Sequence, residues 1–280
     1  MMAMAAIPPW LILARGAQDA LLAFAVGACG FGPLVALPGW DRERRWARGG
    51  ALLALLAGAV WFLAEAASTA SATSLGGAIA AVPDFLAYVP FARVLVLRLG
   101  LLVLALALAA WPLASFAAVT AATALQPWLG HAAQIGPVPS LAEAVHVTAA
   151  GLWLGGLPCL LAALRHRPAA EHKPMLRRFG RLGAVAVALL AATGLIQAGF
   201  MLGGPARLLT TQYGRTLVLK LWLFALALVA AAANRFLLVP RLDRAAWVPR
   251  ALRATIAEEA MIGLLILLAA GWLASLAPGL

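Results

Sequence analysis

The sequence predicts an all-α membrane protein, a helical bundle of about eight transmembrane helices, and two observations carry this prediction. Hydrophobic residues make up 64% of the 280 residues and charged residues only 11%, whereas a soluble domain carries about 25% charged residues. The apolar residues form long runs rich in Ala, Leu and Val, without the period-two alternation of a membrane β-barrel. Because only helices or closed barrels satisfy their backbone groups in lipid, we expect helices.

The transmembrane helices are predicted from the lengths of the apolar runs. A helix needs about 20 apolar residues to cross the hydrocarbon core. The predicted spans are 10–37, 49–68, 91–110, 112–128, 141–164, 180–201, 214–234 and 256–277. We interpret the first span as a retained helix, because no basic segment precedes it as in a cleaved signal peptide.

The third and fourth predicted spans could form one long helix or two shorter ones. The stretch from Arg93 to Trp128 is nearly continuous and is interrupted only at Trp111-Pro112. The segments after the first, fifth and seventh spans hold 15 of the 21 Lys and Arg residues. With eight spans all three segments lie on one side of the membrane, whereas seven would separate the first from the others. A proline also suits the first turn of a new helix. We therefore predict two helices here, basic segments in the cytoplasm and both termini outside.

An internal repeat indicates how the spans are grouped. Residues 91–110 and 213–232 are identical at 11 of 20 positions without gaps, and Arg98 aligns with Lys220. Two parallel four-helix halves, 1–128 and 129–280, would be related by an axis along the membrane normal, as in some transporters.

Other classes of protein fit the sequence poorly. The net charge of +11 comes from basic residues in short loops between apolar runs, so we expect a lipid bilayer as partner and no nucleic acid. Cys29 and Cys159 lie inside apolar segments, which argues against a disulfide framework. The chain has no phosphate-binding glycine loop, catalytic triad or zinc-protease helix, so we do not expect an enzyme.

Ionisable and polar residues inside spans are costly in lipid and are candidates for function. Most fall near the predicted outer ends of the spans, where a shared cavity can form, and the inner halves are expected to be nearly free of charge. These candidates are Asp19, Glu65, Arg98, Glu143, His146, Gln197, Met201, Arg215 and Lys220. We expect Arg98 and Lys220 to pair with Asp19, Glu65 or Glu143, either as structural pairs or along a substrate path.

Two histidines and a methionine are the candidate metal ligands. Glu143, His146 and Trp153 share a helix face, and His131 lies in the outer loop that leads to the same helix. Imidazole suits copper, zinc or haem iron, and the spacing does not choose among them. Met201, at the outer end of the sixth span, offers a thioether suited to Cu(I). The cluster Met1, Met2 and Met4 is a weaker candidate of the same kind.

Two ordered motifs resemble the copper-resistance D (CopD-type) membrane family. The first is Gly130-His131-Ala132 followed by His146-x-x-Ala-Ala-x-x-Trp153-x-Gly155-Gly156. The second is Tyr213-Gly214-Arg215-x-Leu217-x-Leu219-Lys220, with Asn234-Arg235 and Pro240-Arg241 downstream. The resemblance runs from about Phe91 onward, and the N-terminal third fits by topology only. The first half departs from the pattern, with Ala92 where the second half has Gly214.

This resemblance implies an inner-membrane protein of bacterial copper homeostasis. It implies movement of copper across the inner membrane, usually inward and often beside a periplasmic copper-binding partner of the CopC type. The resemblance carries His131 and His146 over as copper-site candidates, for Cu(I) or Cu(II). Glu143 is then expected to hold the second ring nitrogen of His146. No ATP-binding element is visible, so transport would follow a gradient or a partner.

Two other functions stay open at the level of sequence. A b-type haem electron-transfer protein would use intramembrane histidines as axial ligands, although His131 is predicted outside the spans. A scaffold for a periplasmic copper chaperone would share the membrane topology without transporting copper.

Overall fold

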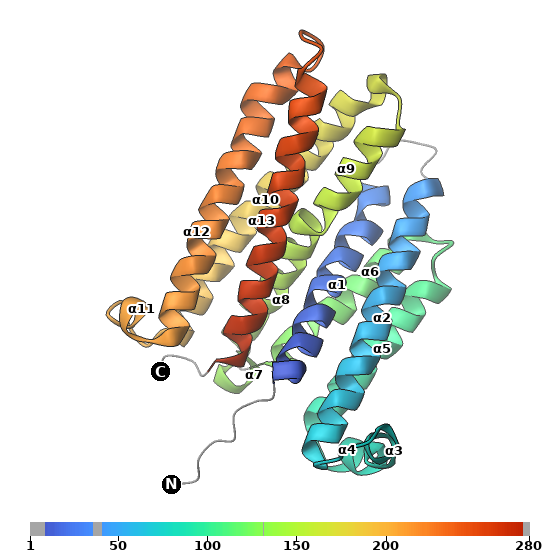
Figure 1. Ribbon diagram of the computed structural model, residues 1–280, viewed down its shortest axis with the longest axis vertical. Coiled ribbons are helices and arrows are strands. Elements are labelled where there is room, and N and C mark those ends of the chain that lie inside the picture. Colours follow the sequence, from blue (N-terminus) through green and yellow to red (C-terminus); the bar gives the residue numbers. More distant parts are fainter. Residues whose placement is uncertain (1–8, 36–40, 131, 277–280) are drawn as a thin grey trace.

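A computed structural model describes residues 9–35, 41–130 and 132–276, which form a bundle of long helices (Figure 1). No strand occurs within these ranges. The predicted all-α helical bundle is therefore confirmed. The helices of the first part of the chain are α1 (Pro9–Leu34), α2 (Asp41–Thr69), α3 (Leu75–Ala80), α4 (Val82–Tyr88), α5 (Pro90–Ala107), α6 (Pro112–Ala124) and η1 (Gln126–Leu129).

The second part of the chain contains four long helices and several short helical turns. They are α7 (Ala132–Ile135), α8 (Pro137–Leu154), α9 (Gly156–His166), α10 (Ala169–Met201), α11 (Arg207–Thr210), α12 (Gln212–Ala232), the π-helical η2 (Ala233–Leu238), η3 (Val239–Arg241) and α13 (Val248–Ser275). The predicted span 141–164 is thus two helices, α8 and α9, which meet at Gly155.

Seven described helical segments are long and apolar enough to cross a membrane. They are Trp10–Leu34, Arg44–Thr69, Pro90–Ala107, Pro137–His166, Ala169–Met201, Gln212–Arg241 and Val248–Ala274. The predicted count of eight is not confirmed, because α6 has only 13 residues. At 1.5 Å per residue it spans about 20 Å, less than the hydrocarbon core of about 30 Å.

The region from α5 to α6 is two antiparallel helices, as the sequence predicts. Ser115 donates to the Ala105 carbonyl oxygen at 2.8 Å, and Arg98 Nε donates to the Ala122 carbonyl oxygen at 3.1 Å. The bonded residues near the turn are 10 positions apart in sequence, and those further from the turn are 24 apart. This increase in separation away from the turn is the pattern of two antiparallel helices. Pro112 occupies the first turn of α6, and Trp111 precedes it in an extended conformation. A single long helix is excluded.

The basic segments gather at one end of the bundle, which we call the basic end. The start of α2, the α9–α10 connection and the connection from η3 to α13 all lie there, at the top of Figure 1. The short helices α3, α4, α7 and α11 lie at the other end, which we call the opposite end (Figure 1). The predicted grouping of the basic residues is confirmed, and its assignment to the cytoplasm stays a prediction.

The arrangement of α5 and α12 agrees with the internal repeat, because both run from the opposite end to the basic end (Figure 1). α1 packs against α2 and α6 on one side and against α8, α9 and α13 on the other. The division into halves 1–128 and 129–280 stays a prediction.

Several helices begin before the predicted edge of the membrane. α2 starts at Asp41, α10 at Ala169 and α13 at Val248, rather than at residues 49, 180 and 256. Arg and Lys side chains extend from helix ends toward water, so the helix continues past the last apolar turn. Apolar length alone therefore underestimates each helix at its basic end.

Two glycines bring α1 and the α8–α9 junction into backbone contact. A Cβ atom on Gly155 would lie 2.0 Å from the Ala23 carbonyl oxygen, and one on Gly27 would lie 2.0 Å from the Gly155 carbonyl carbon. No side chain fits at either position. The close backbone approach at Gly27 and Gly155 places α1 against the α8–α9 junction.

The outer surface of the bundle carries large apolar side chains, which identifies lipid as its solvent. On α12, Trp222 is 68% exposed and Val229 is 69% exposed, more apolar surface than a soluble monomer presents. Cys29 and Cys159 are buried, and no disulfide joins them. The protein is a multi-pass membrane protein.

Candidate metal site and buried polar clusters

A charged cluster joins α1, α5 and η1, and we call Arg15, Asp19, Arg98 and Gln126 the Asp19 cluster. Arg98 is fully buried, and its Nη1 lies 3.8 Å from Asp19 Oδ1. Its Nη2 donates to Gln126 Oε1 at 2.6 Å, while Gln126 Nε2 donates to Asp19 Oδ2 at 3.4 Å. Arg15 Nε lies 4.0 Å from Asp19 Oδ2, one helical turn away on α1. Arg98 was predicted to pair with Asp19, Glu65 or Glu143, and of these three acids it pairs with Asp19.

Arg98 also explains where α6 ends. The last carbonyl groups of a helix have no partner within it and carry partial negative charge. The Arg98 guanidinium donates to one of them, Ala122 O, and then reaches Gln126 just beyond the helix. A buried cation on α5 therefore fixes both the end of α6 and the position of η1.

Glu65 lies beside this cluster on α2 and bonds a neighbouring aromatic ring. Trp61 Nε1 donates to Glu65 Oε1 at 2.9 Å, and the Arg15 guanidinium carbon lies 5.7 Å from the centre of the Trp61 ring. Arg15 is therefore held between an acid of its own helix and an aromatic ring of α2.

Two further ionisable residues, Glu143 on α8 and Lys220 on α12, connect the Asp19 cluster to helices of the second part of the chain. Glu143 interacts electrostatically with Arg15, Asp19 and Lys220. Lys220 in turn interacts electrostatically with His146. The three acids Asp19, Glu65 and Glu143 thus accompany three basic residues, Arg15, Arg98 and Lys220, so acidic and basic side chains are equal in number here.

His146 is held by a hydrogen bond between α8 and α10. Its Nδ1 lies 2.9 Å from Thr193 Oγ1, and Thr193 Oγ1 lies 2.6 Å from the Leu189 carbonyl oxygen. A hydroxyl group has one hydrogen to donate. Because that hydrogen goes to the Leu189 carbonyl group, Thr193 accepts a hydrogen bond from His146 Nδ1–H. The expectation that Glu143 holds this ring nitrogen is wrong, since Thr193 takes that place. The Nε2 atom then carries the lone pair, which is the form that binds a metal ion.

Met201 lies near the opposite end and accepts a hydrogen bond from Tyr213. Tyr213 Oη lies 3.3 Å from Met201 Sδ, so the end of α10 is joined to the start of α12. Both side chains are buried in an apolar cluster that also contains Ala132. Met201 is thus oriented by a neighbouring phenol.

His131 lies outside the described residues, but the residues on either side of it are described. A Cβ atom on Gly130 would lie 3.6 Å from Arg15 Nη2 and 3.7 Å from Glu143 Oε1. Ala132 is fully buried beside Met201 and Tyr213. Within the described ranges, no group of three or more His, Cys, Asp or Glu side chains could hold a metal ion.

Gln197 and Arg215 bond to their own helices or nearby turns. Gln197 Nε2 donates to the Thr193 carbonyl oxygen at 3.3 Å, and the exposed Arg215 donates to the Thr211 carbonyl oxygen at 3.4 Å. Gln197 therefore lies one turn from the threonine that holds His146, whereas Arg215 belongs to the surface.

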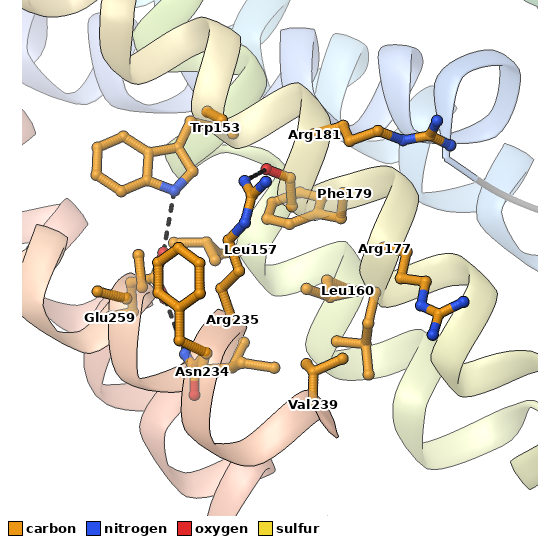
Figure 2. A pocket seen from close by; sticks show the side chains of 18 of the residues that line it. Trp153, Leu157, Leu160, Arg177, Phe179, Arg181, Asn234, Arg235, Val239 and Glu259 are labelled. Carbon is orange, nitrogen blue, oxygen red and sulfur yellow. Dashed lines mark hydrogen bonds between the residues drawn. The ribbon is translucent and has the colours of Figure 1, made fainter. Parts of the chain in front are cut away.

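A second buried polar cluster, the Glu259 cluster, lies further toward the basic end and was not predicted. Trp153 Nε1 donates to Glu259 Oε1 at 3.0 Å, and Asn234 Nδ2 donates to Glu259 Oε2 at 3.1 Å (Figure 2). Thr255 donates to Asn234 Oδ1. Glu259 is only 3% exposed, so the expectation that the inner halves of the spans are nearly free of charge is wrong.

The π-helical turn η2 positions one side of this cluster. A π-helix inserts an extra residue into a helical turn and often occurs at functional sites. Here Asn234 reaches Glu259 on α13, while the next residue, Arg235, donates to the Gly180 carbonyl oxygen on α10 at 2.8 Å. The Glu259 cluster lies at the wall of a cavity of about 870 Å³, also lined by Leu157, Phe179 and Ile256 (Figure 2).

Comparison with known proteins identifies the family. Residues 3–138 match the model of the Copper resistance protein D-like N-terminal domain, and residues 173–273 match that of Copper resistance protein D. Together these two models match most of the chain. A search of solved structures finds no significant match.

Three curated relatives are similar to parts of the chain. Copper resistance protein D of Pseudomonas syringae pv. tomato is 31% identical over 150 residues, which are 49% of this chain and 48% of that protein. Inner membrane protein YebZ of Escherichia coli (strain K12) is 37% identical over 143 residues, again 49% and 48%. Copper transport protein CutJ of Bacillus subtilis (strain 168) is 31% identical over 153 residues, which are 52% of this chain and 27% of that protein.

The chain thus spans about half the length of the first two relatives, at 48% each, and less of the third. The two family models, the relatives and the helical bundle agree with one another. The chain belongs to the copper-resistance D (CopD-type) family of membrane proteins.

Proposed function

We propose that this protein binds copper near the opposite end of the bundle and moves it across the bacterial inner membrane. The observation that carries the proposal is the hydrogen bond from His146 to Thr193, which leaves Nε2 of a half-buried imidazole as a metal-binding atom. The family models and relatives named for copper resistance and copper transport support copper as the ion.

His131 and Met201 complete the proposed ligand set. The neighbours of His131 lie against two groups that belong to this site: Gly130 beside Glu143, one turn before His146 on α8, and Ala132 beside Met201. Imidazole nitrogen binds copper in both oxidation states, whereas a thioether sulfur selects Cu(I). Two imidazoles and one thioether therefore favour Cu(I).

The charges around the site suit a cation that passes through. Asp19, Glu65 and Glu143 equal the basic residues of the same region in number, so in their ionised forms they offset the positive charge that a copper ion would meet. Asp19 Oδ1 and Arg98 Nη1 are buried and have no hydrogen-bond partner among the described residues. Buried polar atoms of this kind are usually satisfied by water, which suits a polar entrance in the membrane.

The orientation follows from the distribution of the basic residues. We place the basic end in the cytoplasm, because short loops rich in Arg and Lys remain there. The opposite end then faces the periplasm, and the copper site is open to a periplasmic copper-binding partner of the CopC type. A relative named as an inner-membrane protein supports the same membrane.

A flux measurement tests transport. Purified protein would be reconstituted in sealed vesicles that hold a fluorescent Cu(I) indicator, with His146→Ala and protein-free vesicles alongside. We expect copper-dependent signal with the wild type and little above background with His146→Ala. Binding without flux would instead support a scaffold for a copper chaperone, and a haem absorption spectrum of the purified protein would support the electron-transfer alternative.

A further inference from the structure

The cavity beside the Glu259 cluster is a gap between two helices that belong to different packing pairs. α10 packs on α8, and α12 packs on α13. Two contacts cross the gap from α10. Arg235 of η2 donates to the Gly180 carbonyl oxygen, and Lys173 Nζ lies 2.6 Å from Oδ2 of Asp243, which follows η3. The gap is therefore spanned by polar bridges, and its volume of about 870 Å³ lies within the range of about 300–1,000 Å³ typical of ligand pockets.

The wall of this cavity is apolar and continues to the lipid-facing surface. Leu157 and Phe179 line its buried side, and Ala184 and Ala232 line it at exposed positions of α10 and α12. Phe236, also in the wall, is 68% exposed. A molecule in the bilayer thus reaches the cavity sideways between α10 and α12, without crossing water.

The rim toward the basic end is positively charged. Arg177 and Arg181 lie one turn apart on α10, and Arg235 reaches toward α10 from η2 (Figure 2). In the described part of the chain neither Arg177 nor Arg181 has a carboxylate partner, whereas Lys173 is paired with Asp243. A guanidinium group can donate two parallel hydrogen bonds to two oxygens of one phosphate, which the ammonium group of lysine cannot do with the same geometry.

We infer that this cavity is a binding site for an anionic phospholipid of the leaflet at the basic end. The phosphate would lie between Arg177, Arg181 and Arg235, and an acyl chain would lie against the apolar wall. Basic pockets between membrane helices bind anionic headgroups in this way. An apolar wall matches the chains and the arginine rim matches the phosphate, so lipid fits the cavity better than a free anion. The positive charge of the arginine rim therefore favours an anionic phospholipid over a neutral or zwitterionic lipid.

The site is distinct from the proposed copper site in chemistry and place. A rim with three arginines repels a copper ion, and His146 lies seven residues before Trp153 on α8 and does not line the cavity. Occupation by lipid would brace α10 against η2, the two elements that the Gly180–Arg235 bond already joins.

Native mass spectrometry of the full chain tests this inference. The protein would be released from detergent with added phosphatidylglycerol, cardiolipin, phosphatidylcholine or glycerol phosphate. We expect a retained adduct with the two anionic lipids and little with phosphatidylcholine or glycerol phosphate. For Arg177→Glu/Arg181→Glu the ratio of lipid-bound to free chain should fall by roughly tenfold or more. Each arginine near an anionic headgroup raises the affinity for the lipid by about fivefold, and this variant removes two. Ala184→Trp, which fills the cavity, should also remove the adduct.

The matched control is Arg244→Glu/Arg250→Glu, which changes the same charge at the same end of the bundle outside the cavity. The inference requires this control to keep the adduct. Equal loss in both double variants, or an unchanged adduct in Arg177→Glu/Arg181→Glu, would overturn it, because the attraction would then be general to the basic surface. An adduct with glycerol phosphate as strong as with lipid would also overturn it in favour of a small-anion site. Far-ultraviolet circular dichroism confirms folding of each variant.

Discussion

Thr193 on α10 accepts a hydrogen bond from His146 on α8, with 2.9 Å between Oγ1 and Nδ1. The contact crosses between two helices and fixes the tautomer of the imidazole, because the threonine hydrogen is donated to the Leu189 carbonyl group. A residue that orients a metal-binding histidine contributes to affinity without touching the metal.

Thr193→Val removes this acceptor and keeps the side-chain shape. We expect copper affinity to fall by about 10–100-fold, as is typical for the loss of a group that orients a ligand, with little change in thermal stability. Thr193→Ser keeps the hydroxyl and should restore most of the affinity. Competition with a Cu(I) chelator of known affinity measures both, and wild-type binding by Thr193→Val would show that the hydrogen bond does not prepare the histidine.

Arg98→Met should destabilise the bundle, because Asp19 loses its buried cation and keeps only Arg15, and the carbonyl end of α6 loses its donor. Removal of one partner of a buried ion pair costs about 3–5 kcal/mol. For a chain of this size such a loss lowers the thermal unfolding midpoint by roughly 6–15 °C. Arg93→Met is the control, since Arg93 is exposed and starts the same helix. Similar midpoints for the two variants would contradict a structural role for the Arg98 pair.

Gly155→Ala should disrupt the contact between α1 and the α8–α9 junction. The new methyl group would lie 2.0 Å from the Ala23 carbonyl oxygen, so the backbone of α1 must move. Overpacking of this kind costs about 1–3 kcal/mol or more. Gly100→Ala, where a Cβ atom meets nothing within 4 Å, should be neutral or stabilising. Thermal unfolding in detergent compares the two, and equal midpoints would rule out the backbone contact.

Trp153 and Glu259 should be energetically coupled. Glu259→Ala leaves two buried donors without an acceptor, and Trp153→Phe removes one of those donors. In a double-mutant cycle we expect a coupling free energy of about 1–2 kcal/mol. Strictly additive changes in the free energy of unfolding would mean that the indole–carboxylate bond contributes nothing.

Single cysteines test the orientation, because Cys29 and Cys159 are buried and give little background. Thr73→Cys and Arg207→Cys lie at the opposite end, and Trp111→Cys and Arg244→Cys lie toward the basic end. A membrane-impermeant maleimide should label the first pair in spheroplasts and the second pair only in inverted vesicles. Labelling of Arg244→Cys in spheroplasts would reverse the proposed orientation.

Much of the fold could be predicted because apolar length is a property of the sequence itself. Seven of the eight predicted spans follow from windows of about 20 apolar residues, whereas α6 is too short to count as the eighth. The turn at Trp111-Pro112 follows from the distribution of basic residues and from the proline. That Arg98 pairs with an acid could also be predicted, since a buried charge in lipid requires a partner. The choice of Asp19 over Glu65 and Glu143 depends on how the helices pack and could not be predicted.

The two polar contacts between helices could not be predicted. His146 and Thr193 meet only because α8 and α10 pack with a particular rotation, which no local pattern encodes. Glu259 was missed because the last span was predicted to begin at residue 256, which places the carboxylate at the membrane edge. α13 begins at Val248, so Glu259 lies deep in the helix. The adjacent Glu258-Glu259 inside an apolar run was the available signal.

Copper bound per purified chain after anaerobic Cu(I) loading is the most direct test of the central claim. The comparison is between wild type, His131→Ala/His146→Ala, and His166→Ala/His172→Ala, whose histidines lie at the basic end. We expect about one copper per chain in the wild type and in the basic-end control, and almost none in His131→Ala/His146→Ala. Equal copper in all three proteins, or loss only in the basic-end control, would contradict a copper site at the opposite end of the bundle.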